Sequence, residues 1–215
     1  MSQNREGDYH NIRLSEDRRR DVLWCALSEY LQRFVPDSSS VLDFGAGYCG
    51  FVNEIKAGKK FAYDQWQGIR QHANADVTPI VGPYQELENQ LEPDSLDIVF
   101  ASNVFEHFTN DELVDVVALL RSRMKVSGRL ILVQPNFYYA YRRYFDDYTH
   151  KSIWTHRSLP DFLTANGFST NYVRGDFMPL TVKSRLPVNK QLIRAYLRSP
   201  IRPMAGQMLV VADKV

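Results

Sequence analysis

Hydrophobic side chains recur at two different spacings along the chain, and the change of spacing separates predicted helices from predicted strands. Between residues 16 and 34 the apolar positions follow helical spacing, which predicts one amphipathic helix opened by the polar run at 15–17. From residue 40 onward, short apolar runs alternate with weaker helical stretches. These runs predict strands at 41–44, 60–64, 77–81, 96–101, 130–133, 168–174 and 207–212.

The order of these elements predicts the fold class. Strands that alternate with helices over short connections favour an α/β domain whose mostly parallel sheet is covered by helices on both faces, a Rossmann-like, doubly wound arrangement. We expect a single domain over 1–215, built from an N-terminal helix at 16–34, a core at 40–135, an aromatic lid or insertion at 137–156 and a basic insertion at 175–205. Ligands of such sheets bind beyond the carboxyl ends of the strands.

Composition narrows the class of protein without naming a partner. The 215 residues carry a formal net charge of +1, so no global charge favours nucleic acid. Two cysteines, Cys25 and Cys49, are too few for a disulfide scaffold. The first twenty residues contain no apolar signal segment, and no apolar run approaches membrane-spanning length, so we expect a cytoplasmic protein.

The clearest chemical signal is a glycine-rich turn between a predicted strand and a predicted helix. Residues 41–50 read V-L-D-F-G-A-G-Y-C-G, and such glycines let the backbone turn tightly and approach a ligand. Asp64 ends the next strand, where a carboxylate can accept bonds from the ribose hydroxyls of an adenosine ligand. Asp43 lies beneath the turn and would repel a pyrophosphate, so a cationic ligand is favoured over a dinucleotide.

These residues resemble motif I of the class I S-adenosylmethionine-dependent methyltransferases. The resemblance continues through 61–64, 94–108 and 124–131 and covers roughly residues 40–135. It implies a seven-stranded sheet with an antiparallel last strand and S-adenosyl-L-methionine as the cofactor. It also implies a set of cofactor-binding residues: Asp43, Gly45 and Gly47 at the methionine end, Asp64 at the ribose, and with them Gln65, Gln85, Ser102 and Asn103.

One departure from that family pattern affects the adenine contact. Pro83 stands where many members carry an acid for the adenine amino group. We therefore expect Tyr84, Gln85 or Glu86 to supply the contact instead.

The second half of the chain looks most like small methyltransferases associated with polysaccharide and glycolipid biosynthesis. The residues that carry this likeness are 103–107, 134–136, 144–148 and 192–200. The likeness implies O-methylation of a sugar hydroxyl on a nucleotide- or lipid-linked sugar. N- or C-methylation of another small metabolite, a non-catalytic adenosyl-ligand binding module and an NAD-dependent reductase remain alternatives.

Three residues are candidates for the acceptor site. His107 follows the fourth strand and could act as general base, or it could brace the next helix. Asn136 follows the fifth strand and could hold the acceptor or form an Asx turn. Asp147 could accept bonds from sugar hydroxyls or be a solvated acid of the lid. Asp146, Asp147 and His150 are residue types that bind metals, but their spacing does not favour a site, so we expect no metal.

A basic segment near the C-terminus is the last candidate surface. Arg194 and Arg198 are one helical turn apart and share a face, so they could bind a diphosphate or rest on an anionic membrane. A solvated basic helix packed by its apolar side explains the same pattern. The other basic residues of the segment are Lys183, Arg185, Lys190 and Arg202.

Overall fold

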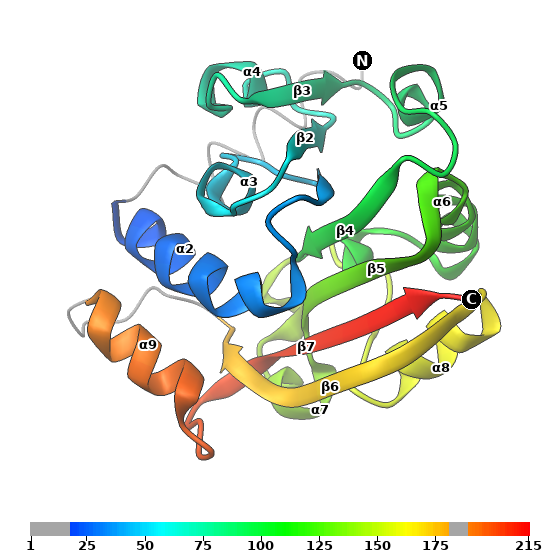
Figure 1. The fold of residues 1–215 in the computed structure, drawn as a ribbon. Helices are drawn as coiled ribbons and strands as arrows, with labels where there is room; N and C mark the ends of the chain where they lie inside the picture. The colour runs from blue at the N-terminus through cyan, green and yellow to red at the C-terminus, as the bar shows by residue number, and fades with distance from the viewer. Residues whose placement is uncertain (1–17, 181–188) are drawn as a thin grey trace.

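A computed structural model describes residues 18–180 and 189–215, and a seven-stranded sheet forms its centre. The strand order is β3-β2-β1-β4-β5-β7-β6, and β7 alone runs antiparallel to its neighbours β5 and β6 (Figure 1). This arrangement confirms the expected Rossmann-like α/β class. The strands are β1 (Ser40–Phe44), β2 (Lys59–Asp64), β3 (Val77–Val81), β4 (Leu96–Ser102), β5 (Met124–Pro135), β6 (Phe168–Pro179) and β7 (Ala205–Lys214).

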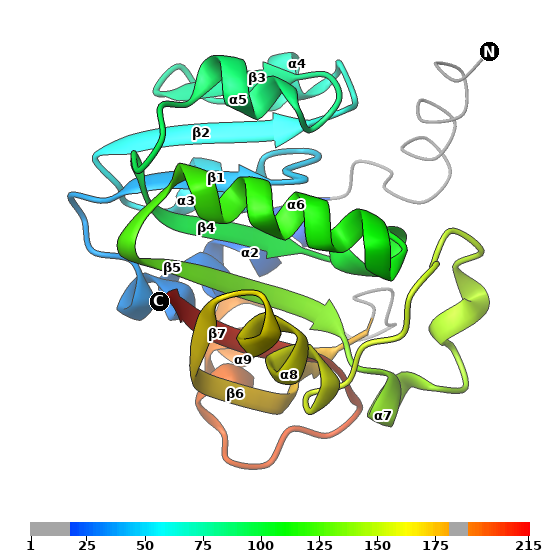
Figure 2. The same cartoon turned by 90° about the vertical axis from the view of Figure 1, so that its right-hand side faces the viewer.

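Alternate residues of the central strands bury into two separate cores, one on each face of the sheet. In β4, Val99 packs into one core, whereas Ile98 and Phe100 pack into the other. Both faces are thus covered, and this is why the strands read as continuous apolar runs in the sequence. Figure 2 shows α6 and α8 in front of the sheet, with α2 and α9 behind it.

The helices that pack into the core of Val99 are α5 (Glu86–Gln90), α6 (Asn110–Arg123) and α8 (Ser158–Ala165). The helices that pack into the core of Ile98 and Phe100, on the opposite face, are α2 (Arg18–Leu31), α3 (Gly50–Glu54), α4 (Ile69–His72) and α9 (Lys190–Arg198). None of the described helices is both long and apolar enough to cross a bilayer. The predicted helix start at 15–17, and the basic residues Lys183 and Arg185, lie outside the described residues.

Two strands are longer than the sequence predicted. Strand β5 contains an irregularity before the predicted strand at 130–133: Ser127 takes a positive φ of 61°, and the pairing with β4 shifts register between Met124 and Arg129. Strand β5 therefore begins at Met124 instead of Leu130. Strand β6 runs on to Pro179, so the expected basic insertion at 175–205 begins with five residues of sheet.

The segment 137–156 has short helical turns rather than no regular structure. It contains α7 (Phe137–Ala140) and the 3-10 turn η3 (Tyr144–Asp146). Two further 3-10 turns occur, η1 (Gln32–Phe34) after α2 and η2 (Phe105–His107) after β4. Turn η2 carries His107 to the sheet edge where the site lies.

Candidate functional site

A cavity of about 530 Å³ opens at the carboxyl ends of β1 and β4, where the strand order reverses. This position is where ligands of open α/β sheets bind, and the volume suits a nucleoside-sized ligand. Most of the predicted site residues line it, namely Asp43, Gly45, Gly47, Asp64, Gln65, Ser102, Asn103 and His107. Gln85, Asn136 and Asp147 are not among the lining residues.

The glycine turn after β1 is held against β2 by its own backbone. Gly45 and Ala46 both donate their N–H groups to the carbonyl of Tyr63, at 2.8 and 2.9 Å. Gly45 has a φ of +78°, and a Cβ there would lie 2.4 Å from Cγ2 of Val104. Conformation and space thus both require glycine, which keeps the floor of the cavity open to a ligand.

Asp64 connects the turn to the end of β2. Its Oδ2 accepts the N–H of Gly47 at 2.8 Å, and its Oδ1 accepts the N–H of Trp66 at 2.9 Å. A carboxylate offers about four lone-pair positions, so one that accepts backbone bonds can accept bonds from a ligand as well, and Asp64 lines the cavity. This geometry fits the predicted role of Asp64 at the ribose hydroxyls.

Asp43 is a buried acid on the cavity wall. Burial raises the pKa of its carboxyl to about 8, although a bond from the Val52 backbone works in the opposite direction. A buried carboxyl group is stabilised as the anion by a nearby cation. The ammonium of S-adenosylmethionine is such a cation, so Asp43 fits the methionine end of that cofactor.

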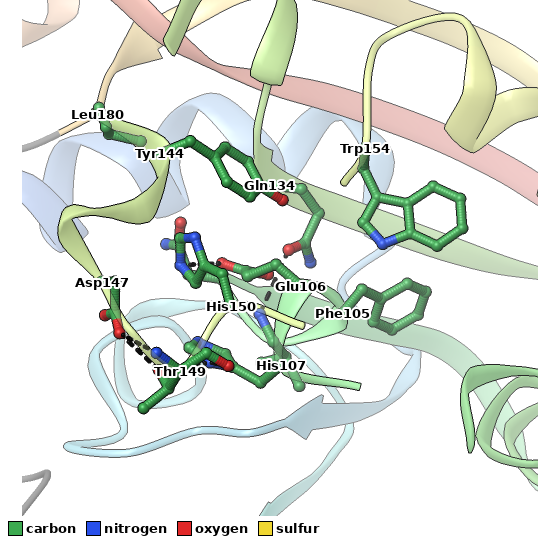
Figure 3. Close-up of polar contacts among 12 residues, drawn as sticks. Phe105, Glu106, His107, Gln134, Tyr144, Asp147, Thr149, His150, Trp154 and Leu180 are labelled. Carbon is green, nitrogen blue, oxygen red and sulfur yellow. Dashed lines mark hydrogen bonds and ion pairs between the residues drawn. The ribbon is translucent and has the colours of Figure 1, made fainter. Parts of the chain in front are cut away.

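His107 is oriented by a short chain of polar groups. Its Nδ1 lies 3.0 Å from Oγ1 and 3.4 Å from the carbonyl oxygen of Thr149 (Figure 3). Because a carbonyl only accepts, this contact favours the tautomer with hydrogen on Nδ1, leaving Nε2 as the acceptor. Oγ1 of Thr149 in turn donates to Oδ1 of Asp147 at 2.5 Å.

The charge states along this chain follow from burial and hydrogen bonding. Burial lowers the pKa of His107, which keeps the imidazole neutral. Burial raises the pKa of Asp147, but the two bonds from Thr149 outweigh it, and the pKa of Asp147 stays below its usual value. Asp147 thus stands behind His107 as a carboxylate, one residue removed from the cavity.

Asn136 does not face the cavity. It is fully buried, and its side-chain nitrogen lies within hydrogen-bond distance of the Gly175 carbonyl and of Nδ1 of His156. Its side-chain oxygen accepts the N–H of Tyr138 and caps α7. The structure thus places Asn136 in the Asx-turn role that the sequence left open.

Gln85 does not line the cavity either. It is the exposed N-cap residue of α5. Tyr84 and Glu86, the other residues considered for adenine, are absent from the lining too. The end of β3 instead approaches the site through Gly82, whose carbonyl accepts the hydroxyl of Tyr63 at 2.9 Å.

Three of the four described basic residues of the C-terminal segment, Lys190, Arg194 and Arg202, are engaged by other groups of the chain. Arg194 donates two bonds to the carboxylate of Glu29, at 2.7 and 2.8 Å, and Lys190 lies 2.6 Å from the same group. Arg202 is buried and donates to the carbonyls of Phe177 and Leu197. Arg194 thus packs α9 onto α2, which helical spacing alone does not show, whereas Arg198 is exposed and its predicted contact with a phosphate or membrane stays a prediction.

Two groups of cavity residues were not predicted. Arg20, Asp21 and Trp24 reach the cavity from the first turns of α2, and Tyr148, Thr149 and Lys151 reach it from the segment after η3. Helical spacing in 16–34 reports only which side of α2 is apolar. A sequence cannot show that Trp24 lies on Gly50, where a Cβ would be 2.3 Å from its ring.

The comparisons with known proteins agree with this geometry. Residues 42–132 match a family model described as a methyltransferase domain. No curated protein sequence matches the chain. The structure is similar to a SAM-dependent methyltransferase from Archaeoglobus fulgidus, with 22% identity over 87% of this chain and 93% of that one and a TM-score of 0.62.

Two further solved structures share the fold. An S-adenosylmethionine-dependent methyltransferase from Mesorhizobium loti is 15% identical over 88% of this chain and 98% of that one, with a TM-score of 0.62. A geranyl diphosphate methyltransferase in complex with SAM is 18% identical over 89% and 85%, with a TM-score of 0.61. Residues 42–132 thus form a methyltransferase domain, and the fold built around them is the one seen in solved S-adenosylmethionine-dependent methyltransferases.

Proposed function

We propose that this protein transfers the methyl group of S-adenosylmethionine to a hydroxyl group of a sugar. The observation that carries the proposal is that one cavity joins the cofactor residues to an oriented histidine. Gly45, Gly47 and Asp64 form one wall, and His107 forms part of another. A methyl donor and an acceptor bound there would share one enclosed space, and this is what in-line transfer needs.

The residues of the chain have separate tasks in this reaction. Bound S-adenosylmethionine supplies an activated methyl group on a sulfonium. Asp64 holds the ribose and Asp43 faces the ammonium, so the donor is fixed in place. Nε2 of His107 accepts the hydroxyl proton as the new C–O bond forms and the C–S bond breaks, and the cofactor product is a neutral thioether.

The chemistry of the remaining cavity wall supports a sugar acceptor. Trp24 and Tyr148 provide aromatic surface, on which the apolar face of a sugar ring can stack. Asp21, Thr149 and Lys151 provide hydrogen-bonding groups at the same wall. Aromatic and hydrogen-bonding side chains together can bind a sugar ring, which has a flat apolar face bordered by hydroxyl groups.

The two cysteines are free thiols, in keeping with a proposed cytoplasmic location.

The test is methyl transfer to defined acceptors. Purified protein is incubated with isotope-labelled S-adenosylmethionine and a panel of free sugars, nucleotide sugars, amines and activated carbon acids, and both S-adenosylhomocysteine and methylated product are measured by mass spectrometry. We expect an O-methylated sugar. His107→Gln should lower kcat by about two to four orders of magnitude, and Asp161→Asn on the exposed side of α8 should not. Transfer to amines or carbon acids alone would contradict the proposal.

A further inference from the structure

A buried acid beside the cavity has no hydrogen-bond partner for its side chain among the described residues. The Glu106 carboxyl is 1% exposed, and neither of its oxygens has a hydrogen-bond partner within the described chain. Leaving such a buried group without a hydrogen-bond partner is costly to the stability of the fold. The mechanism proposed above does not use Glu106, so its burial is unexplained by methyl transfer alone.

Two imidazoles lie next to this carboxyl group. Glu106, His107 and His150 each contribute one ligand atom to a set in which all atoms lie within 4.8 Å of one another. Nε2 of His150 is 4.0 Å from Oε1 of Glu106, and Figure 3 draws both side chains side by side. Two histidines and one carboxylate make a ligand set known for zinc and for non-haem iron.

The surroundings hold these three side chains in place. Lys151 and Ser152 both donate backbone N–H groups to the Glu106 carbonyl, at 2.8 and 3.2 Å, which joins the His150 segment to η2. The ring of Tyr144 packs on His150 with centroids 4.6 Å apart. Thr149 engages Nδ1 of His107, which assigns the metal-binding role to Nε2. Metal-binding histidines typically have such a partner on the ring nitrogen that does not bind the metal.

We propose that Glu106, His107 and His150 form a binding site for a divalent transition-metal ion of the zinc type. Donor atoms at about 2.1 Å from one ion lie about 3.4 Å apart in a tetrahedral site. The observed separations therefore need only small side-chain rotations. Three protein ligands leave one position open, and His107 lines the cavity, so that position would face the acceptor.

The sequence could not indicate this site. Among residue types that bind metals it brought up Asp146, Asp147 and His150, which are close along the chain, and it predicted no metal there, whereas Glu106 and His150 of this cluster are 44 positions apart. Neither aspartate belongs to the cluster. Asp147 contributes only through Thr149, as an outer partner of His107.

The inference goes beyond the proposed reaction and does not depend on it, because metal binding is measured without cofactor or acceptor. Both proposals, methyl transfer and metal binding, use the same atom of the protein. Nε2 of His107 cannot both hold an ion and accept a proton, so we expect bound zinc to inhibit the proposed methyl transfer.

The experiment measures binding of Zn²⁺ and Co²⁺ to the full chain after chelator treatment. Calorimetry gives the stoichiometry and affinity for Zn²⁺, and visible absorption reports the coordination geometry of Co²⁺. Glu106→Gln keeps the size of the side chain and removes the charge, and His150→Gln removes a second ligand. His72→Gln, outside the cluster, is the matched control. Circular dichroism checks that each variant is folded.

We expect one tightly bound ion per chain, a Co²⁺ spectrum of low coordination number that Zn²⁺ abolishes, and affinity reduced by at least about tenfold in both cluster variants but not in the control. Absence of stoichiometric binding to the unmodified protein would overturn the proposal. So would binding that neither cluster variant weakens. If Glu106→Gln does not fold, His150→Gln decides the same question.

Discussion

The backbone N–H of Gly47 donates to Oδ2 of Asp64 at 2.8 Å, so the glycine turn after β1 and the acid that ends β2 are directly bonded. A change to either one will therefore disturb the other. The bond thus connects, across the sheet edge, two residues that are 17 positions apart in the sequence. The cofactor site is thus one preorganised unit, and Asp64 has a structural role in addition to its proposed role at the ribose.

Replacement of Asp64 by asparagine tests this double role. The amide nitrogen would face either the N–H of Gly47 or that of Trp66, both of which need an acceptor. We expect S-adenosylmethionine affinity to fall by a factor on the order of ten to a hundred, since a bond to a charged group contributes about 1.5–3 kcal/mol. Calorimetric titration with S-adenosylmethionine, S-adenosylhomocysteine and NADH measures it. Asp161→Asn is the control, and unchanged affinity in Asp64→Asn would refute the assignment.

Replacement of Gly45 by alanine tests the close approach at the turn. The new Cβ would lie 2.4 Å from Cγ2 of Val104, and the alanine backbone would have to keep the φ of +78° that Gly45 has. We expect a loss of about 2–4 kcal/mol in the free energy of unfolding, from left-handed strain and overpacking together. In a Val104→Ala background the clash is removed, and the same change should cost only about 1–2 kcal/mol. Urea denaturation measures both, and equal costs in the two backgrounds would exclude the clash.

The raised pKa of Asp43 predicts that cofactor binding releases a proton. In the unbound protein this carboxyl titrates at about 8, so it is protonated at neutral pH. The ammonium of the cofactor stabilises the anion, so the proton leaves on binding. Affinity should therefore increase as pH rises toward about 8 and level off above it.

Calorimetry in buffers of different ionisation enthalpy measures this proton release. The cofactor amine also titrates near this pH, so Asp43→Asn is the necessary control, because it keeps that titration and removes the one in the protein. The same pH dependence in both proteins would show that Asp43 does not face the ammonium.

The contact between α2 and α9 predicts a modest effect on stability. Bonds from Arg194 and Lys190 lower the pKa of Glu29 to about 2, against an ordinary value of 4.5. The stabilisation is therefore present above pH 4.5 and lost as the pH falls toward 2. Because Glu29 is 42% exposed, Glu29→Gln should cost no more than about 1 kcal/mol at neutral pH. Urea denaturation across pH tests this, and a difference from the unmodified protein that grows on acidification would contradict it.

The sequence predicted the sheet better than it predicted the site. Periodicity placed β3 at its observed bounds, Val77–Val81, although it is an edge strand in which only Val77 and Ile80 are buried. The start of α6 carries a local signal of another kind: Thr109 is its N-cap and forms a reciprocal capping box with Glu112, a T-x-x-E pattern that hydrophobic periodicity does not detect.

Contacts between residues that are far apart in the sequence could not be predicted from it. The glycine turn and Asp64 follow a local order that a pattern can show. The contact of Glu106 with His150 depends on how the segment after α7 returns to η2, and the pairing of Arg194 with Glu29 depends on how α9 meets α2. No spacing along the chain encodes either distance.

The backbone bonds from Lys151 and Ser152 to Glu106 also limit how the cavity can be uncovered. They tie the last part of the segment 137–156 to the sheet, and Trp154 is bonded to Ser152 behind them. The segment cannot swing away as a whole without breaking these bonds. Tyr144 is buried and its hydroxyl donates to the Ser152 carbonyl at 2.8 Å, so the middle of the segment is held as well. The acceptor would therefore enter past the exposed side chains of Phe145 and Tyr148, which can move while the backbone stays in place.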